Sequence, residues 1–302
     1  MGIVTLDFQN LDLSCSEELC RLLENGEILY FPKSPLQIPD KDIDFLLAQR
    51  QVKSGYRKNI AYKPNRNTIS GLAGRSPEIS QRMFKVMSNF SASVTDLLQQ
   101  LLSPYVPTWK IDYASFRPRQ EKGRQVKFKA RNDLLHIDSF PTRPTYGNRI
   151  LRFFININPH QSRNWVTAKS FEYLLETYIG SPEMPLPSGH EVLFTKWKRQ
   201  LCRWAKHFGF PVAAPSRYDE FMLCLHDYLK SNQTFQEIEA QQKIEFPPNS
   251  SWMVFTDFVP HAALSGQFAL EQTFLIDHNS MLQPEKSPLR LLEKSSGISL
   301  LS

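Results

Sequence analysis

Few cysteines and no long hydrophobic run limit what this sequence can encode. Only four of the 302 residues are cysteine, at positions 15, 20, 202 and 224, and none forms a C-x-x-C pair. We therefore expect neither a disulfide framework nor a cysteine zinc site. No stretch approaches the roughly 18 consecutive apolar residues of a membrane-spanning helix. The N-terminal sequence, MGIVTLDFQN, lacks the basic and apolar regions of a secretion signal, so we expect a cytoplasmic protein.

Glycine is also scarce, with 12 residues against 21 prolines and 21 phenylalanines. This balance indicates aromatic-rich strands separated by proline-containing loops. The 41% apolar and 22% charged residues are typical of a globular protein with a substantial core. The net charge of +6 favours an anionic partner, which leaves nucleic acid, an acidic membrane surface and an anionic small molecule open.

Hydrophobic spacing predicts helices first and mostly strands later. The motif Ser14-x-x-Glu17 resembles a capping box that opens a helix ending at Asn25-Gly26, and a strand at 27–31 follows. Apolar residues from Met83 to Leu101 recur every three or four positions, as in an amphipathic helix. From about residue 110 the predicted strands are 111–117, 125–129, 148–157, 251–256, 261–265 and 268–276, the last two joined by a hairpin turn at 266–267. Between 164 and 242 the pattern becomes helical, with helices through 171–178, 193–208 and 218–230.

We interpret this order as one domain, mainly β with α. Its jelly-roll core comprises residues 110–160 and 244–280, preceded by N-terminal helices and flanking strands in 1–109 and interrupted by a helical insert at 161–243.

The segment LHID at 135–138 carries the strongest chemical signal. Alternation along a strand points His136 and Asp138 to the same side, where an imidazole and a carboxylate converge. A third ligand from a distant strand would complete a facial triad that leaves adjacent positions on iron open. We assign this ligand to His261, which follows Pro260 just after the end of the predicted strand 251–256 and opens the predicted hairpin. The H-x-D pattern alone also fits a structural histidine beside a carboxylate. The other five histidines, including His226 on a predicted helix, fit a metal site less well.

The surrounding sequence resembles the Kdo hydroxylases. Residues 136–152 read HIDSFPTRPTYGNRILR, with NINP at 156–159, and the resemblance extends through DFVPHAALSGQ at 257–267. These bacterial enzymes hydroxylate 3-deoxy-D-manno-oct-2-ulosonic acid (Kdo) in lipopolysaccharide. The resemblance implies a double-stranded β-helix, Fe(II), 2-oxoglutarate and O₂ as cofactors or co-substrates, and ascorbate as a reductant in vitro. It also implies hydroxylation at C3 of Kdo on Kdo-lipid A, with release of succinate and CO₂.

One feature departs from the wider oxygenase superfamily. Many members carry an Arg or Lys about ten residues after the distal histidine to bind 2-oxoglutarate, but residues 262–274, AALSGQFALEQTF, contain neither. On the strand that starts near Asn148, a row of Asn148, Arg152 and Asn156 alternates with apolar residues. We expect Arg152 to bind the co-substrate carboxylate, with Arg149 as second choice. An outward-facing Arg152 stays open because the register of the strand is uncertain.

Basic and hydroxyl-bearing residues near the predicted triad suggest substrate contacts. Thr142, Arg143, Thr145 and Tyr146 suit a polyol acid, and Arg117 begins a basic segment that ends at Arg131. Trp197 and Trp204 share a face of the helix at 193–208, which also carries many cations. That helix suits peripheral binding to an anionic inner-membrane surface, although ordinary packing of this face against the barrel or a second subunit is the more common explanation of such a pattern.

Two other functions remain compatible with the sequence. The first is an Fe(II)/2-oxoglutarate oxygenase that acts on protein or nucleic acid, although we find no nucleic-acid-binding motif and expect no such partner. The second is a jelly-roll module that binds sugar or lipid without catalysis and whose histidines are structural.

Overall fold

Two β-sheets form the centre of the protein in the computed structural model, which describes residues 2–52, 59–73, 76–188, 214–239 and 242–301. The larger sheet has eight strands in the order β1-β2-β9-β6-β11-β5-β3-β4, and the smaller has three in the order β10-β7-β8. All neighbouring strands are antiparallel except β1 and β2. The strands are β1 (Ile3–Thr5), β2 (Ile28–Phe31), β3 (Ile60–Lys63), β4 (Thr68–Ser70), β5 (Lys110–Arg117), β6 (Arg149–Asn156), β7 (Arg163–Thr167), β8 (Gln242–Phe246), β9 (Ser251–Phe255), β10 (His261–Ser265) and β11 (Ala269–Ile276).

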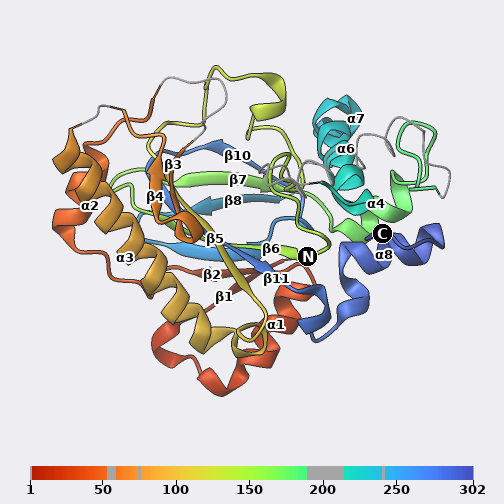
Figure 1. Ribbon diagram of the computed structural model, residues 1–302, viewed down its shortest axis with the longest axis horizontal. Coiled ribbons are helices and arrows are strands. Elements are labelled where there is room, and N and C mark those ends of the chain that lie inside the picture. The colour runs from red at the N-terminus through yellow and green to blue at the C-terminus, as the bar shows by residue number, and fades with distance from the viewer. Residues whose placement is uncertain (1, 53–58, 74–75, 189–213, 240–241, 302) are drawn as a thin grey trace, which may run out of the picture.

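Helices lie in two groups around the sheets. In Figure 1, α2 and α3 lie at one end of the molecule, α1 lies below the sheets, and α4, α6, α7 and α8 gather at the other end. The described α-helices are α1 (Ser16–Glu24), α2 (Asp40–Leu47), α3 (Pro77–Leu101), α4 (Phe171–Thr177), α6 (Arg217–Ser231), α7 (Gln233–Ile238) and α8 (Pro288–Ser296). Short 3₁₀ helices occupy 8–10, 13–15, 64–66, 103–105, 128–130, 278–280 and 284–286. In the described part of the chain, no helix is long and apolar enough to cross a membrane.

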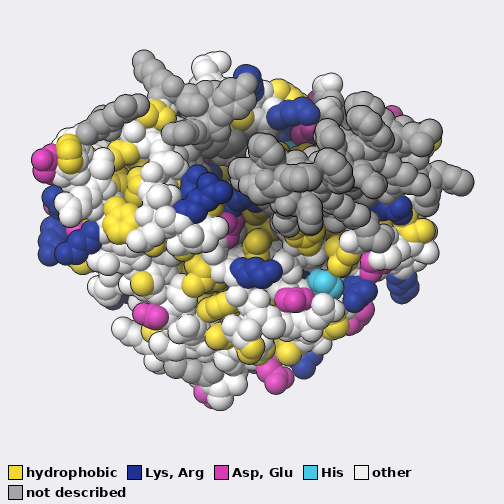
Figure 2. Space-filling view, in the orientation of Figure 1, with side chains coloured by type: hydrophobic (Ala, Val, Ile, Leu, Met, Phe, Trp, Pro, Cys, Tyr) yellow, Lys and Arg dark blue, Asp and Glu magenta, His cyan; other side chains and the backbone are white. Residues whose placement is uncertain are grey.

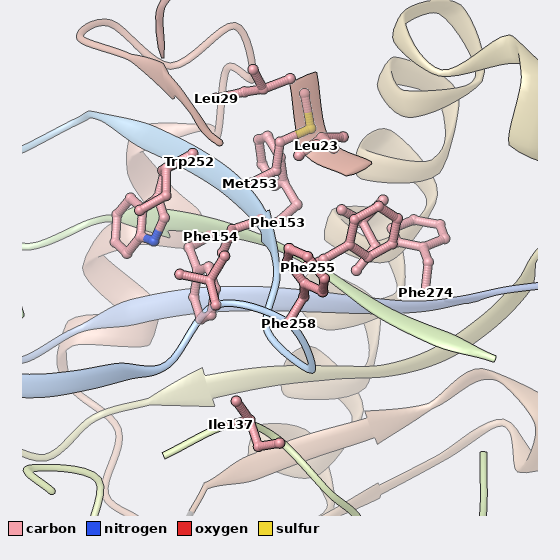
Figure 3. Packing of buried hydrophobic residues seen from close by; sticks show 14 of the residues in the cluster. Leu23, Leu29, Ile137, Phe153, Phe154, Trp252, Met253, Phe255, Phe258 and Phe274 are labelled. Atoms are coloured by element: carbon pink, nitrogen blue, oxygen red, sulfur yellow. The ribbon is translucent and has the colours of Figure 1, made fainter. Parts of the chain in front are cut away.

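An aromatic cluster joins the two sheets. Trp165 of β7 meets the edge of Phe154 of β6 at a ring-centroid distance of 5.1 Å and Trp252 of β9 at 5.5 Å. Neighbouring residues on the same strands point the other way, so Met253 and Phe153 pack near Leu29 on the opposite side of the large sheet (Figure 3). Burial of both faces explains why β6 and β9 carry consecutive apolar residues, at 153–155 and 252–255.

Most predicted elements are present, and the differences have physical causes. Thr167 and its neighbours in β7 form a strand that the sequence placed in the helical insert, because five residues give too short an alternation to recognise. The predicted strand at 125–129 is wrong, since no strand lies there and a 3₁₀ helix covers 128–130. The predicted hairpin at 266–267 is also wrong: β10 pairs with β7 and β11 with β5 and β6, so this turn crosses between sheets.

The first helix also begins differently from the prediction. Ser14 lies in a short 3₁₀ helix capped by Asp12, and α1 starts only at Ser16 without a side-chain cap, so the predicted capping box is absent. The predicted amphipathic helix at 193–208 lies outside the described residues. The remaining expectation, strands with helices before and between them, agrees with a mixed α and β fold.

Candidate metal centre and its cavity

The predicted triad comes together because the segment of residues 134–138 runs beside β10. The backbone N–H of His136 donates to the carbonyl of His261 at 3.1 Å, and the N–H of His261 donates back at 2.9 Å. This reciprocal pair brings the two imidazoles to the same side. The flanking Leu135 and Ile137 are buried, so the polar residues between and after them face one cavity.

The three side chains have the geometry of a metal site. The candidate ligand atoms of His136, Asp138 and His261 all lie within 4.8 Å of one another. The distance from His136 Nε2 to Asp138 Oδ1 is 3.8 Å. The Nδ1 atom of His136 lies 2.7 Å from the Leu134 carbonyl, and that of His261 lies 2.9 Å from the Val259 carbonyl. Each Nδ1–H therefore donates to the backbone, which leaves both Nε2 lone pairs for a metal ion.

Electrostatics hold the triad in its ligating charge state. Burial is the main cause that lowers the pKa of His136 well below its usual range, and it also lowers the pKa of His261. Burial alone would raise the pKa of Asp138, but the Arg152 guanidinium and smaller contributions that include a hydrogen bond with Thr256 together outweigh this effect and lower it. Near neutral pH the imidazoles are thus neutral and the carboxylate is ionised. Two imidazoles and one carboxylate fit Fe(II), which takes this ligand set in facial triads.

Arg152 on β6 links the triad to a buried charge network. Its Nε lies 2.9 Å from Asp138 Oδ2, and its Nη1 lies 2.7 Å from Glu271 Oε1 on β11. Arg117 of β5 also binds Glu271, through Nε at 2.9 Å. The guanidinium of Arg152 therefore faces the interior, as predicted, but two carboxylates of the protein already share it.

Arg163 on β7 is a second interior cation, and the sequence analysis missed it. Only 1% of this residue is exposed, and its nearest carboxylate oxygen, Glu121 Oε1, is 3.4 Å from Nη2. Burial lowers the pKa of Arg163 to about 10, which still leaves it charged at neutral pH. Arg163 was not predicted because β7 was not predicted: a charged residue in a predicted helical insert gives no sign that it faces the interior.

Two cavities share His136 and Asp138 in their lining. A cavity of about 720 Å³ is lined by His136 and Asp138 and by several cations. These cations are Arg117, Lys127, Lys129, Arg143 and Arg152. A small cavity of about 30 Å³ behind it touches all three triad residues together with Arg163 and Trp165. Figure 2 shows some Lys and Arg side chains near the centre of one face of the molecule and others around its edge.

The predicted substrate residues divide into two groups. Arg117, Thr142 and Arg143 line the larger cavity. Arg143 forms an ion pair with Asp112, and its guanidinium lies 4.0 Å from the centre of the Tyr113 ring.

Thr145 and Tyr146 are absent from the described lining of the cavity and form hydrogen bonds with residues at and before the start of α6 instead. The Thr145 N–H donates to Asp219 Oδ1 at 2.7 Å, and the Tyr146 hydroxyl donates to the Ala214 carbonyl at 2.9 Å. These contacts fasten the loop after the triad to the start of α6.

Three residues predicted to bind the co-substrate lie elsewhere. Arg149 is fully buried in an ion pair with Asp257 at 2.8 Å, because a residue three positions from Arg152 points to the opposite face of the strand. Asn156 donates to the carbonyls of Gln161 and Phe246 at the far end of β6. Asn148 precedes the strand in a turn, where its N–H donates to the Thr145 carbonyl.

His226, which the sequence placed on a helix with no link to the metal site, lies beside the triad. It belongs to α6, and its ring centroid is 5.0 Å from that of His136 in an edge-on contact. Its Nδ1 atom is 2.7 Å from the carbonyl of Ile137. The sequence offered no signal for this contact, because 89 positions separate the two hydrogen-bonded residues.

Comparisons with known proteins agree with this geometry. A sequence model of a family described as 3-deoxy-D-manno-oct-2-ulosonic acid (Kdo) hydroxylase matches residues 9–299. The structure is similar to the apo structure of the Kdo hydroxylase KdoO, a non-heme Fe(II) alphaketoglutarate dependent dioxygenase, with 33% identity and a TM-score of 0.86, covering 100% of this chain and 98% of that one. The cobalt(II) complex of KdoO gives the same values. Its complex with alphaketoglutarate and Fe(III) gives 32% identity and a TM-score of 0.84, covering 99% and 97%. A comparison with curated proteins finds no match.

Proposed function

This chain belongs to the Kdo hydroxylase family, and from that premise we propose that it hydroxylates C3 of the Kdo sugar in Kdo-lipid A. It is a non-haem Fe(II), 2-oxoglutarate-dependent dioxygenase. The observation that carries the proposal is the buried His136, Asp138 and His261 triad at the base of a cationic cavity. Family membership also favours an enzyme over a non-catalytic sugar-binding module.

The three ligands, with the residues behind them, prepare the site for iron. His136 and His261 offer Nε2, and Asp138 offers Oδ1 while its other oxygen contacts Arg152. Bound Fe(II), with 2-oxoglutarate and O₂, supplies the oxidising power that places one oxygen atom in the substrate and the other in succinate, with loss of CO₂. The protein supplies position, charge and a cavity with restricted access to water.

We assign the distal carboxylate of 2-oxoglutarate to Arg163 in preference to Arg152. Arg152 makes contacts of 2.9 and 2.7 Å with two carboxylates of the protein, whereas the nearest carboxylate to Arg163 is 3.4 Å away. A buried guanidinium with weakly engaged donors suits an incoming carboxylate. In this arrangement Arg152 orients the metal-binding carboxylate.

The larger cavity suits the sugar acid. Arg117 and Arg143, which also pair with Glu271 and Asp112, place positive charge on the cavity wall for the Kdo carboxylate, and Thr142 offers a hydroxyl group for the polyol. The cavity volume of about 720 Å³ falls in the range typical of small-molecule sites. The lipid A part of the substrate would then extend past the cavity mouth, where Lys127 and Lys129 can meet phosphates.

A double-stranded β-helix is the fold that we propose for the core. Its support is the chain order, in which β5, β6, β9 and β11 enter the large sheet while residues 134–138, β7, β8 and β10 lie in or beside the small one. On this interpretation the chain is one oxygenase domain, and the part of 161–243 that follows β7 is inserted between β7 and β8.

We further propose that the enzyme works in the cytoplasm, at the inner face of the inner membrane. The net charge of +6 supports attraction to anionic lipid, and a lipid-anchored substrate would require such docking. Sedimentation with anionic but not neutral liposomes is the expected result, and equal sedimentation with both would count against this location.

The direct test is turnover. Purified protein with Fe(II), ascorbate and 2-oxoglutarate should release succinate when Kdo-lipid A is added and should add one oxygen atom to the Kdo unit. His136→Ala should abolish both products. Succinate release with a peptide or nucleic acid, but not with Kdo-lipid A, would instead support the alternative substrates.

A further inference from the structure

The segment that carries two of the metal ligands has a backbone neighbour on only one side. His136 pairs with His261 of β10, and this is an isolated bridge, not part of a longer ladder. The backbone groups of Leu135 and Ile137 point to the opposite edge, because successive residues of an extended chain alternate in direction. Both residues are buried, so these polar groups need partners from the protein.

Side chains from α6 and α7 occupy this edge. The Oε1 atom of Gln236 accepts from the N–H of Leu135 at 2.8 Å, and its Nε2 donates to the carbonyl of Leu135 at 2.9 Å. One residue thus receives the donor and acceptor pair that a neighbouring strand would give it. The Nδ1–H of His226 donates to the next available carbonyl, that of Ile137, at 2.7 Å.

The two side chains are themselves held in place. The Nε2 of Gln236 also donates to the carbonyl of Leu229 at 2.8 Å, which ties α7 to the last turns of α6. The ring of His226 packs edge-on against that of His136. The clamped residues alternate with the ligands, so fixing the backbone at Leu135 and Ile137 fixes the directions in which the ligand side chains leave the chain.

We propose that Gln236 and His226 form a surrogate strand, a pair of positioning residues that hold His136 and Asp138 in ligating geometry without binding the metal. This inference rests on the proposed iron site. It gives the described helices between β7 and β8 a role in the metal centre, whereas the sequence suggested a role, membrane docking or packing, only for the helix predicted at 193–208.

The first test compares two glutamines of the same helix. Gln236→Met keeps the side-chain length and removes all three hydrogen bonds. Gln233→Met is the matched control, because Gln233 is exposed and its amide donates to Glu237. We expect Gln236→Met to weaken Co(II) binding by about tenfold or more, as other residues that orient metal ligands do. Calorimetric titration of the full-length, metal-free protein measures this affinity, and the control should stay within about twofold of wild type.

Hydrogen exchange on the metal-free protein gives a readout that is independent of activity. The amides of residues 134–138 should exchange about tenfold faster or more in Gln236→Met, because the N–H of Leu135 loses its acceptor, while those of β6 keep their rates. If wild-type protein binds no Co(II), the proposed iron site is wrong. This exchange measurement would still decide whether the surrogate strand of Gln236 and His226 holds the segment 134–138.

A second pair of variants tests the surrogate strand if Gln236→Met does not fold. His226→Asn retains an N–H donor near the position of Nδ1, whereas His226→Leu removes it. We expect the leucine variant to weaken Co(II) binding and the asparagine variant to restore most of the affinity. Co(II) affinity and exchange within twofold of wild type in both Gln236→Met and His226→Leu would overturn the proposal.

Discussion

Strand β6 and the segment 134–138 contact each other through Arg152 and Asp138, but they are held in place by different kinds of interaction. From Arg149 to Asn156, β6 is hydrogen bonded to β11, and its middle part also pairs with β9. The segment 134–138 has one backbone bridge, to His261, and one further backbone hydrogen bond, from the N–H of Asp138 to the carbonyl of Thr256 at 2.7 Å; its other edge is bound by side chains from helices. The contrast teaches that stability of this fold and positioning of its ligands are carried by different interactions and should respond separately to substitution.

The largest separation is expected at the ligands. Asp138→Ala should abolish turnover and weaken metal binding more than about 100-fold, beyond the loss typical of residues behind the ligands. Its thermal stability without metal should fall only modestly, because Arg152 loses one carboxylate partner but keeps the other, Glu271. Calorimetric metal titration and circular dichroism measure the two quantities. Retained metal affinity would show that Asp138 is not a ligand.

The opposite separation is expected in β6. Phe153 is fully buried on the face of the large sheet away from Arg152, so Phe153→Ala should lower the free energy of unfolding by about 3–5 kcal/mol. Metal affinity of the folded protein should not change. Denaturant unfolding measures the loss, and Phe128→Ala, at a residue 48% exposed, should change stability by only about 0.5 kcal/mol. A joint loss of stability and metal affinity in Phe153→Ala would break the comparison.

Sequence patterns predicted the region that is held by backbone pairing much better than the region that is held by side chains. The strands β6, β10 and β11 and the helix α3 are recognisable because burial requires regular apolar spacing. The convergence of His136 and Asp138 was also predictable from the sequence, since an i, i+2 pair on an extended segment must face one side.

Residues that meet only through tertiary structure were not predictable in this way. Arg163 begins a strand of five residues, too short to reveal which face it occupies. Gln236 contacts Leu135 across 101 positions, and neither local spacing nor propensity encodes such a contact. The assignment of Arg149 to the co-substrate depended on where β6 begins, and its partner Asp257 explains its burial.

Metal removal should affect the two regions unequally. At a free concentration about 100 times the Kd, metal stabilises the folded protein by about 2.7 kcal/mol. We expect its removal to accelerate amide exchange most at residues 134–138, with much smaller changes in β6. Mass spectrometry of amide exchange with and without Co(II) checks this. Equal acceleration in both regions would show that the segment 134–138 depends on the metal no more than β6 does.

The smallest expected effect is a difference between variants of two interior arginines, Arg163 and Arg152. Arg163→Met should raise KM for 2-oxoglutarate by roughly 30-fold, corresponding to about 2 kcal/mol for a lost buried charge contact, with metal affinity nearly unchanged. Arg152→Met should instead weaken metal binding, because Asp138 loses its partner. Steady-state kinetics and metal titration on both variants measure the split. The reverse pattern would return the co-substrate carboxylate to Arg152.

The most direct test of the central claim is a Co(II) titration of the metal-free full-length chain, in parallel with His261→Ala. The triad predicts one ion bound per wild-type chain, tighter binding of 2-oxoglutarate after the metal is added, and loss of both in the variant. Wild-type protein that binds no ion, or a His261→Ala variant that binds one with unchanged affinity, would contradict the assignment of residues 136, 138 and 261 as a single metal centre.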